Sequence, residues 1–345
     1  MNTNSNINFA IIGCGHIGKR HIEMLMRNTE CKVIAACDIL PEKTINTQYE
    51  GVKYYADAKQ MLLDNPLIDV VCICTPNGLH ASQALMCLDA GKHVVIEKPM
   101  ALSKADCEKI IFKSLQVSRH VFCVMQNRYS PPSVWLKEII ETKTLGDVFI
   151  VQLVCYWNRD SRYYKGDTWH GTADLDGGTL FTQFSHWIDL LYWLFGDIKD
   201  ILTTFADYNH ATTTAFEDSG IVQFKFENGA MGSINYSTSV WDKNLESSLT
   251  VIGSKGSIKV GGQYMNEVEY CHIENYTMPS LEPTNPANDY GAYKGSANNH
   301  HLVFSNVVNT LKGKTSATTN ALEGLKVVEI IERIYQHNTL NKKGK

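Results

Sequence analysis

The chain has 345 residues, of which 44% are hydrophobic and 20% are charged, and its formal net charge is −4. This composition is typical of a folded globular protein with one large or two ordinary domains. The slight negative charge excludes a broad basic surface for nucleic acid or for an anionic membrane. Since no apolar run approaches the roughly 20 residues of a membrane span and the N-terminus lacks a signal-peptide pattern, we expect a cytoplasmic protein.

Residues 1–126 alternate short apolar runs with amphipathic stretches. Helices are predicted to begin near Ile17, Ala58 and Leu79, and another covers 103–116, while strands are predicted at 8–13, 31–38, 52–56, 69–75, 92–97 and 119–126. The strands are apolar throughout, as in a parallel sheet that is covered on both faces. The pattern predicts an α/β fold with a doubly wound parallel sheet of the Rossmann type.

The pattern changes after residue 126, where alternating strands predict a second α/β domain with a large, mostly antiparallel, open sheet. The run 149–157 alternates, 217–240 is a hairpin turning at Asn228 and Gly229, and 247–262 is another hairpin. Helices are predicted at 177–195 and 322–336, and an irregular loop at 276–299. We predict domains at 1–126 and 127–337, with the last helix packing back on the first domain, and a tail at 338–345.

The ten cysteines include no Cys-x-x-Cys pair, and eight of them precede residue 127, mostly within apolar runs. Buried thiols of this kind behave as small hydrophobes in a reducing compartment. We therefore expect neither disulfides nor a metal site.

A glycine motif follows the first predicted strand and opens the first helix. Gly13, Gly15 and Gly18 have G-x-G-x-x-G spacing, with His16 and Ile17 inside the motif. In this context the glycines permit a tight turn, approach of the backbone to a pyrophosphate, and close packing of helix on strand. The helix N-terminus adds unpaired N–H groups for the phosphates.

Asp38 ends the second strand, 20 residues after Gly18, where an acid is expected to hydrogen-bond the adenosine ribose. A carboxylate at this position repels a 2′-phosphate, and no arginine follows it directly. The sequence therefore predicts a dinucleotide-binding domain that prefers NAD over NADP.

Polar residues follow the fourth and fifth strands, and ligands bind at the carboxyl ends of the strands in such a sheet. Thr75, Pro76, Asn77 and His80 follow the fourth strand, and Glu97, Lys98 and Pro99 follow the fifth. We expect both groups on the cofactor side, with Lys98 beside the nicotinamide. Glu97 is expected to position Lys98 or to contact the nicotinamide ribose.

The order of G-x-G-x-x-G, T-P-N-x-x-H and E-K-P, followed by "LDGGTLFTQFSHWIDLLYWLFGD" at 175–197, resembles the glucose–fructose oxidoreductase / inositol dehydrogenase / MocA family over nearly the whole chain. The resemblance implies a Rossmann domain, a second domain with an open sheet, and homodimers or homotetramers formed through that sheet. It also implies that Lys98 and His186 are catalytic.

The implied chemistry is oxidation of a secondary alcohol by NAD. Histidine titrates near neutral pH and can accept the hydroxyl proton, and a lysine cation stabilises the developing alkoxide. Which of the two residues takes the proton first is left open. Asp189, three residues after His186, either orients the imidazole or holds a helix end.

One departure from the family concerns the substrate. Sugar and inositol dehydrogenases of the family usually carry an aspartate four residues before the histidine, where this chain has Thr182, followed by Gln183. Members of the UDP-N-acetylglucosaminuronate 3-dehydrogenase type more often have an Asn-Gln pair there. The approach to the helix resembles that branch too, with Tyr163, Tyr164 and Trp169 where the branch has a Tyr-Tyr…Trp run, while His170 replaces its arginine.

Candidate contacts to an acidic or phosphate-bearing substrate lie in two segments. Arg128 and Tyr129 follow the sixth strand, and the loop before the histidine helix carries Arg159, Arg162 and Lys165. These cations could meet a carboxylate or a pyrophosphate.

The leading hypothesis is therefore an NAD-dependent dehydrogenase of a nucleotide-linked or acidic hexose, with a role in nucleotide-sugar metabolism such as lipopolysaccharide biosynthesis. Three alternatives stay open: a polyol or free-sugar dehydrogenase of the inositol type, an NAD-dependent glycosidase that uses transient oxidation, and a non-enzymatic dinucleotide-binding regulator. The sequence does not fix the sugar, the hydroxyl or the direction of the reaction.

Overall fold

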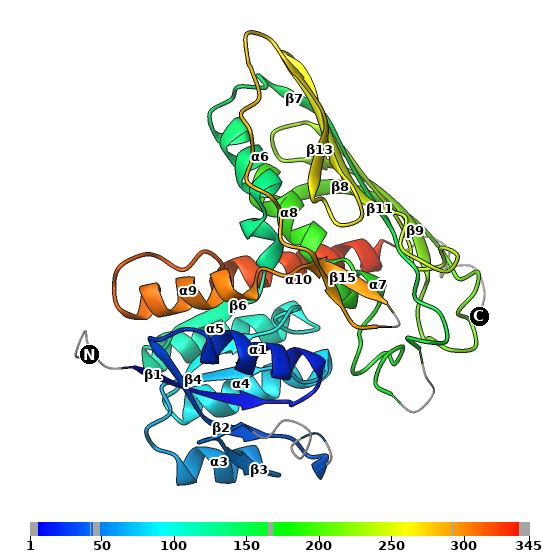
Figure 1. The fold of residues 1–345 in the computed structure, drawn as a ribbon. Coiled ribbons are helices and arrows are strands. Elements are labelled where there is room, and N and C mark those ends of the chain that lie inside the picture. The colour runs from blue at the N-terminus through cyan, green and yellow to red at the C-terminus, as the bar shows by residue number, and fades with distance from the viewer. Residues whose placement is uncertain (1–5, 42, 44–48, 165–167, 292, 338–345) are drawn as a thin grey trace. The chain divides into compact units, whose positions relative to one another are not determined.

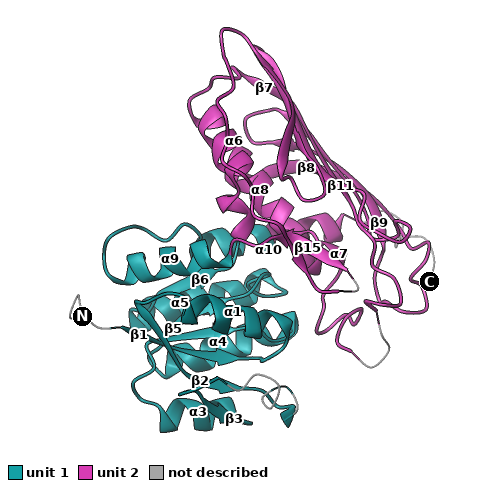
Figure 2. Ribbon diagram, in the orientation of Figure 1, with its two compact units in different colours: residues 1–125, 300–328 teal, residues 126–299, 329–345 magenta. Residues whose placement is uncertain are grey.

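The computed structural model describes residues 6–41, 43, 49–164, 168–291 and 293–337 (Figure 1). Contacts divide the chain into two compact units. Unit 1 comprises Met1–Met125 and His300–Val328, and unit 2 comprises Gln126–Asn299 and Glu329–Lys345 (Figure 2). Within the described residues, no helix is long and apolar enough to cross a membrane.

Unit 1 is built on a six-stranded sheet with the order β3-β2-β1-β4-β5-β6. Its strands are β1 (Ile7–Ile12), β2 (Cys31–Cys37), β3 (Lys53–Tyr55), β4 (Val70–Ile73), β5 (His93–Ile96) and β6 (Val121–Cys123). All five pairings are parallel, and the order reverses direction beside β1. The predicted doubly wound Rossmann sheet is therefore confirmed, and its reversal point lies where dinucleotides bind in such sheets.

The helices of this sheet begin close to the positions predicted. They are α1 (His16–Met26), α3 (Ala58–Asp64), α4 (His80–Asp89) and α5 (Lys104–Val117), and α1, α3 and α4 pack on the strands. Asp57 and Ser103 cap α3 and α5 by accepting hydrogen bonds from Gln60 and Asp106 backbone N–H groups. The strands β4 and β5 are buried at every position, which explains their unbroken apolar sequence.

The segment His300–Val328 belongs to unit 1, which the linear division at 126/127 did not anticipate. Its helix α9 (His300–Leu311) packs on α1, and the Phe304 ring meets Phe9 edge-on at 6.1 Å. The helix α10 (Ala321–Gln336) begins in this segment and continues into unit 2. Whether 1–126 and 127–337 fold as separate domains stays a prediction.

Unit 2 holds a seven-stranded sheet with the order β13-β12-β11-β7-β10-β9-β8. The strands are β7 (Val148–Tyr156), β8 (Ile198–Ala206), β9 (Ser219–Phe226), β10 (Met231–Ser237), β11 (Glu246–Gly253), β12 (Gly256–Gly261) and β13 (Glu267–Ile273). Only the β7/β10 pair among these is parallel, and both predicted hairpins are present. The mostly antiparallel sheet is confirmed.

The single helix predicted over 177–195 is wrong, because the structure has two helices there, α7 (Thr179–Thr182) and α8 (Ser185–Phe195). Gly178 has φ +136°, which keeps the helix from starting earlier, and Phe184 leaves helical geometry with φ −117° and ψ 6°. The side chains of Phe184 and Trp187 are buried beside Trp157, so tertiary packing overrides the helical pattern.

Three further features were not predicted. The helix α6 (Pro131–Glu141) starts with two prolines, contacts α8 and follows a short 3-10 helix, η2 (Gln126–Tyr129). The loop 276–299 is not wholly irregular, because β14 (Ala287–Asp289) and β15 (Lys294–Ala297) form a small hairpin. The tail predicted at 338–345 lies outside the described residues.

Candidate active site

The glycine motif forms the turn between β1 and α1. A Cβ atom on Gly18 would overlap the carbonyl oxygen of Gly13, so close packing excludes any side chain there. A Cβ on Gly15 would meet no protein atom within 4 Å. Packing within the protein therefore does not require a glycine at position 15. A ligand that approaches the backbone closely at this position would require one.

Asp38 and the start of α1 lie beside this turn. The Asp38 carboxylate accepts hydrogen bonds from Cys14 N at 2.7 Å and from Leu40 N at 2.9 Å, so its position is fixed while each oxygen keeps acceptor capacity for a ribose hydroxyl. No side chain caps α1. His16 is exposed in the first turn, and partial burial with nearby cations lowers the pKa of its imidazole. These residues fit the adenosine half of a dinucleotide.

His80 ties the two strand-end loops together. Its Nε2 lies 2.9 Å from the Thr75 carbonyl oxygen, and its Nδ1 lies 2.7 Å from that of Pro99. The ring is fully buried, and burial lowers its pKa. His80 therefore joins the loops that carry Thr75 and Lys98, and its contact with the cofactor stays a prediction.

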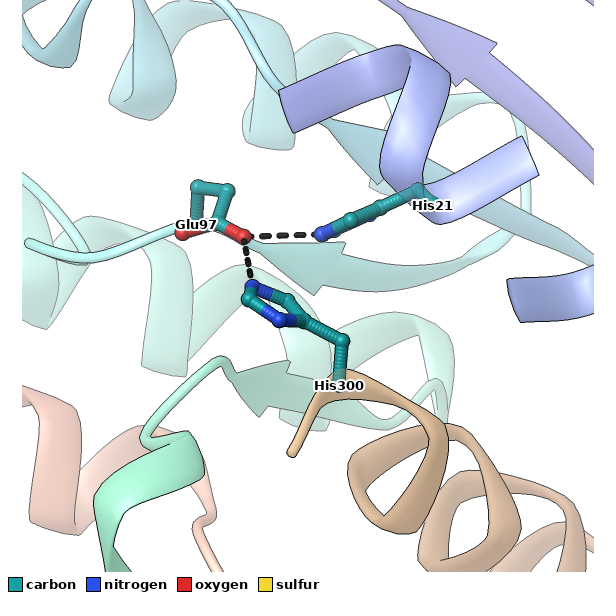
Figure 3. Close-up of side chains that lie close together, drawn as sticks. All are labelled: His21, Glu97 and His300. Carbon is teal, nitrogen blue, oxygen red and sulfur yellow. Dashed lines mark hydrogen bonds and ion pairs between the residues drawn. The ribbon is translucent and has the colours of Figure 1, made fainter. Parts of the chain in front are cut away.

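Glu97 is the centre of a buried polar cluster in unit 1 (Figure 3). Its Oε1 accepts a hydrogen bond from His21 Nε2 at 2.7 Å and lies 3.6 Å from His300 Nε2. Burial alone would raise the pKa of Glu97, but the two histidines hold it well below its usual range. The three ligand atoms lie within 4.8 Å of one another, a spacing that would also suit a metal ion. The absence of a metal site stays a prediction.

Lys98 follows this anchored glutamate. Its backbone N–H donates to Glu97 Oε2 at 3.2 Å, and its peptide bond to Pro99 is cis. Lys98 itself is only partly buried. This contact agrees with a role of Glu97 in positioning Lys98, and its contact with the nicotinamide ribose stays a prediction.

In unit 2, His186 lies on α8 with 3% of its surface exposed. Gln126 Nε2, in η2, donates to His186 Nε2 at 3.2 Å and also to Ser296 Oγ at 3.2 Å. This contact joins η2 to the histidine of α8. Gln126 was missed by sequence analysis, since it lies 60 residues from its partner and belongs to no recognised motif.

Arg128, which the sequence offered as a substrate contact, is paired with an acid of α8, and its binding of substrate stays a prediction. Its guanidinium forms a two-point ion pair with Asp189, with Nη2–Oδ1 at 2.6 Å and Nε–Oδ2 at 2.8 Å. Both side chains are buried. The charge of Arg128 is therefore compensated by Asp189, and this ion pair joins η2 to α8. Tyr129 is half-buried beside Arg128.

Arg159, by contrast, is buried among neutral acceptors. Its Nε donates to Gln183 Oε1 at 2.8 Å, and Gln183 Nε2 donates to Tyr163 Oη at 2.8 Å. The guanidinium also lies against the rings of Trp157 and Tyr293, at 4.6 and 5.0 Å from their centroids. Gln183 is thereby fixed by Arg159 and Tyr163, a contact that the sequence did not predict.

The predicted aromatic residues gather at the same place. The His170 ring lies 4.3 Å from that of Tyr163 and 4.0 Å from that of Trp169, and Tyr164 packs edge-on against Tyr163 at 4.9 Å. Tyr163 and Tyr164 are buried, while Trp169 and His170 are half-buried. Lys165 lies outside the described residues.

The turn that leads into α7 is braced by two carboxyl groups that the sequence analysis did not select. Thr182 Oγ1 donates to the carboxylate of Asp176, whose other oxygen accepts from Gly171 N. Glu217 Oε1 accepts from Tyr236 Oη and Tyr335 Oη, both at 2.8 Å. Burial raises the pKa of Glu217 to about 7, and the tyrosine hydrogen bonds oppose that rise.

Comparisons with known proteins cover both units. The NAD-binding Rossmann model of the GFO/IDH/MocA oxidoreductase family matches residues 7–123, and the model of its C-terminal domain matches residues 134–259. A curated relative, myo-inositol 2-dehydrogenase of Thermotoga maritima, is 26% identical over 72% of this chain and 73% of its own length.

Two solved structures are similar over almost the whole chain. One is the WlbA dehydrogenase of Bordetella pertussis in complex with NADH and UDP-GlcNAcA, with 30% identity, a TM-score of 0.85 and coverage of 96% of each chain. The other is the Chromobacterium violaceum WlbA dehydrogenase with the same ligands, with 32% identity, a TM-score of 0.85 and coverage of 97% of this chain and 94% of that one.

Proposed function

The chain belongs to the GFO/IDH/MocA family of NAD-dependent oxidoreductases, as its motifs predicted, and we propose that it oxidises a ring hydroxyl of a UDP-linked sugar acid such as UDP-GlcNAcA. The single observation that carries this proposal is the likeness over nearly the whole chain to two dehydrogenases whose structures hold NADH and UDP-GlcNAcA. The replacement of the family's usual aspartate by Thr182, beside Gln183, supports a substrate other than a simple polyol.

In this proposal each half of the chemistry has its own residues. NAD, when bound, accepts the hydride. Lys98, held by Glu97, stabilises the negative charge that develops on the substrate oxygen. His186, which contacts Gln126, accepts the hydroxyl proton when its imidazole is neutral, since an imidazolium could not.

An absorbance screen for NADH formation tests the proposal. Free hexoses, inositols, UDP-linked hexoses and UDP-linked hexuronic acids are compared side by side, and we expect turnover with the last group. Turnover with inositols alone would instead favour the polyol activity of the Thermotoga maritima relative. Release of sugar from a glycoside without net NADH would favour the hydrolytic alternative.

The variant Lys98→Ala tests the role of the lysine. We expect a loss of turnover of at least about 100-fold, the range typical of a lost proton-transfer or charge-stabilising group. NAD affinity, measured by calorimetry, should change little, because Gly15 and Asp38 are untouched. Weak NAD binding with normal turnover per bound cofactor would contradict this assignment.

We also propose that the protein is a cytoplasmic homo-oligomer. Ile150, Met231 and Ile252 are aligned in register across three neighbouring strands and are each exposed by 38% or more, which supports contact with a second copy. The ten free thiols support a reducing compartment. Light scattering of wild type and Met231→Lys should show an oligomer that the substitution dissociates, and a monomeric wild type would refute the proposal.

A further inference from the structure

Arg159 is as buried as an arginine in an internal ion pair, but it has no acidic partner among the described residues. It is 2% exposed, and no acidic side chain among the described residues lies within 4.0 Å of it. Its acceptors are the Gln183 side chain, the carbonyl oxygens of Asn158 and Lys294, and the Asn244 side chain. All four acceptors are neutral. The guanidinium of Arg159 therefore has hydrogen-bond partners, but its positive charge is not balanced by a negative one.

The surroundings of Arg159 leave donors for a further group. Arginine has five N–H bonds, and four of them are accounted for by these acceptors, which leaves one on Nη2. Tyr163 Oη accepts from Gln183, and no described residue accepts its proton. Burial raises the pKa of Tyr163 well above its usual value, so the phenol stays protonated and able to donate. The two remaining donors belong to one side-chain cluster.

We propose that the substrate supplies the missing counter-ion, and that an anionic oxygen of the substrate binds at the cluster of Arg159, Gln183 and Tyr163. This inference rests on the proposed function, since that function gives the substrate two anionic groups, a sugar carboxylate and a diphosphate. Both groups present oxygens that accept from a guanidinium and a phenol. The cluster therefore selects for an anionic substrate, and this selection does not depend on Lys98 or His186.

Gln183 provides the sharpest way to test this. A glutamate has the same shape, so Gln183→Glu can keep the contact with Arg159 Nε, while its second oxygen can accept the proton of Tyr163. The substitution places a counter-ion inside the protein where the substrate's anion is proposed to act. The aromatic rings that pack around the Arg159 guanidinium should stay in place in this variant, whereas Arg159→Met would remove the group they pack against.

The experiment compares UDP-linked N-acetylglucosaminuronic acid with UDP-linked N-acetylglucosamine, which differ only at C6, where the first has a carboxylate and the second a neutral hydroxymethyl group. We expect the wild type to prefer the acid in kcat/KM. Gln183→Glu should reduce that preference by about tenfold or more, the effect of truncating or balancing a buried charge pair. An equal fall for both substrates would support the diphosphate as the anion, and unchanged kcat/KM for both would overturn the proposal.

Two control variants keep this result specific. Arg162→Met removes a nearby exposed cation that is already paired with Asp160 and Asp242, and the preference should stay as in wild type. Asp167 belongs to the same loop but lies outside the described residues, so Asp167→Asn tests it as an internal counter-ion. Two results together would overturn the proposal. Asp167→Asn would bind UDP-linked N-acetylglucosaminuronic acid more tightly than wild type does, and Gln183→Glu would leave the preference for that acid in kcat/KM unchanged.

Binding measurements separate a failure of this inference from a failure of the proposed function. Calorimetry with UDP-GlcNAcA, glucuronate and UDP is run on wild type and on Gln183→Glu. If no substrate forms NADH but an anion binds at least about tenfold more weakly to Gln183→Glu, the anion site stands and the proposed activity falls. If NADH forms and binding is equal in both proteins, the anion site falls and the activity stands.

Discussion

Two arginines of unit 2, both 2% exposed, are buried in opposite ways. Arg128 forms a two-point ion pair with Asp189 and lies 5.3 Å from the Trp193 ring. Arg159 contacts three aromatic rings and neutral acceptors only. The first arrangement is complete within the chain, while the second leaves a charge that an external anion can balance. The comparison separates a structural arginine from a candidate binding residue.

Glu217 shows a third way of burying a titratable group. Its carboxyl lies between Tyr236 and Tyr335, and burial raises its pKa to about 7, so at mildly acidic pH it is neutral. A carboxyl can take up a proton when it lacks a cation, but a guanidinium cannot lose one in a protein. Arg159 therefore stays charged when buried, whereas Glu217 can become neutral by binding a proton.

Removing the partner of Arg128 should have the largest effect. Asp189→Asn leaves a buried guanidinium without its carboxylate, and such a change typically costs about 3–5 kcal/mol of unfolding free energy. Chemical denaturation of the variant measures the loss. The double variant Arg128→Met/Asp189→Leu is the control, because replacing the whole pair by apolar side chains should recover most of the stability. A single variant within about 1 kcal/mol of wild type would break the comparison.

The next effect concerns the pH dependence of Glu217. Its pKa is raised from 4.5 to about 7 in the folded protein, so the associated stability is present below pH 4.5 and is lost as pH rises to about 7. The difference amounts to about 3 kcal/mol. Glu217→Gln should flatten the stability profile over this window and exceed wild type above pH 7. Parallel profiles of the two proteins by denaturation at several pH values would contradict this.

Gln183→Glu should act on stability in the direction opposite to Asp189→Asn. Supplying a carboxylate to Arg159 balances a buried charge, and we expect the ligand-free variant to gain about 1–2 kcal/mol, less the cost of burying the new carboxylate. Thermal unfolding without ligand measures it, with Gln183→Leu as the control of similar size that keeps neither hydrogen bond. A Gln183→Glu variant less stable than Gln183→Leu would show that Arg159 needs no counter-ion.

The smallest effect is expected at Arg162, in the same loop as Arg159. Its side chain is 42% exposed and pairs with Asp160 and Asp242. Exposed ion pairs contribute little, because water screens them. The melting temperature of Arg162→Met should match that of wild type within measurement error. A clear fall would mean that this loop is held by charge in a way that its exposure does not suggest.

The sequence predicted those parts of the molecule whose cause is local. The glycine turn between β1 and α1 follows from spacing within one βαβ unit, and the strands β4 and β5 follow from unbroken apolar runs. The Asn228–Gly229 hairpin needs only its turn residues and alternating flanks. In each case the determining residues lie within about one element of one another, so the pattern is visible without the fold.

The roles that the sequence did not predict depend on distant partners. Arg128 and Arg159 are equally basic in the sequence, and only Asp189, 61 residues from the first, and Gln183, 24 residues from the second, distinguish them. His80 resembled a cofactor ligand because it follows a strand end, yet its ring is buried between two carbonyl groups. Gln126 has no local signal at all. Partner identity is a property of tertiary packing.

The most direct test of the account is a crystal structure with NAD and UDP-GlcNAcA bound. The account predicts that a carboxylate or phosphate oxygen of the substrate lies within hydrogen-bond distance, about 2.7–3.2 Å, of Tyr163 Oη or Arg159 Nη2. A complex in which every anionic oxygen of the substrate is bound elsewhere, with Arg159 still surrounded by neutral acceptors alone, would contradict it.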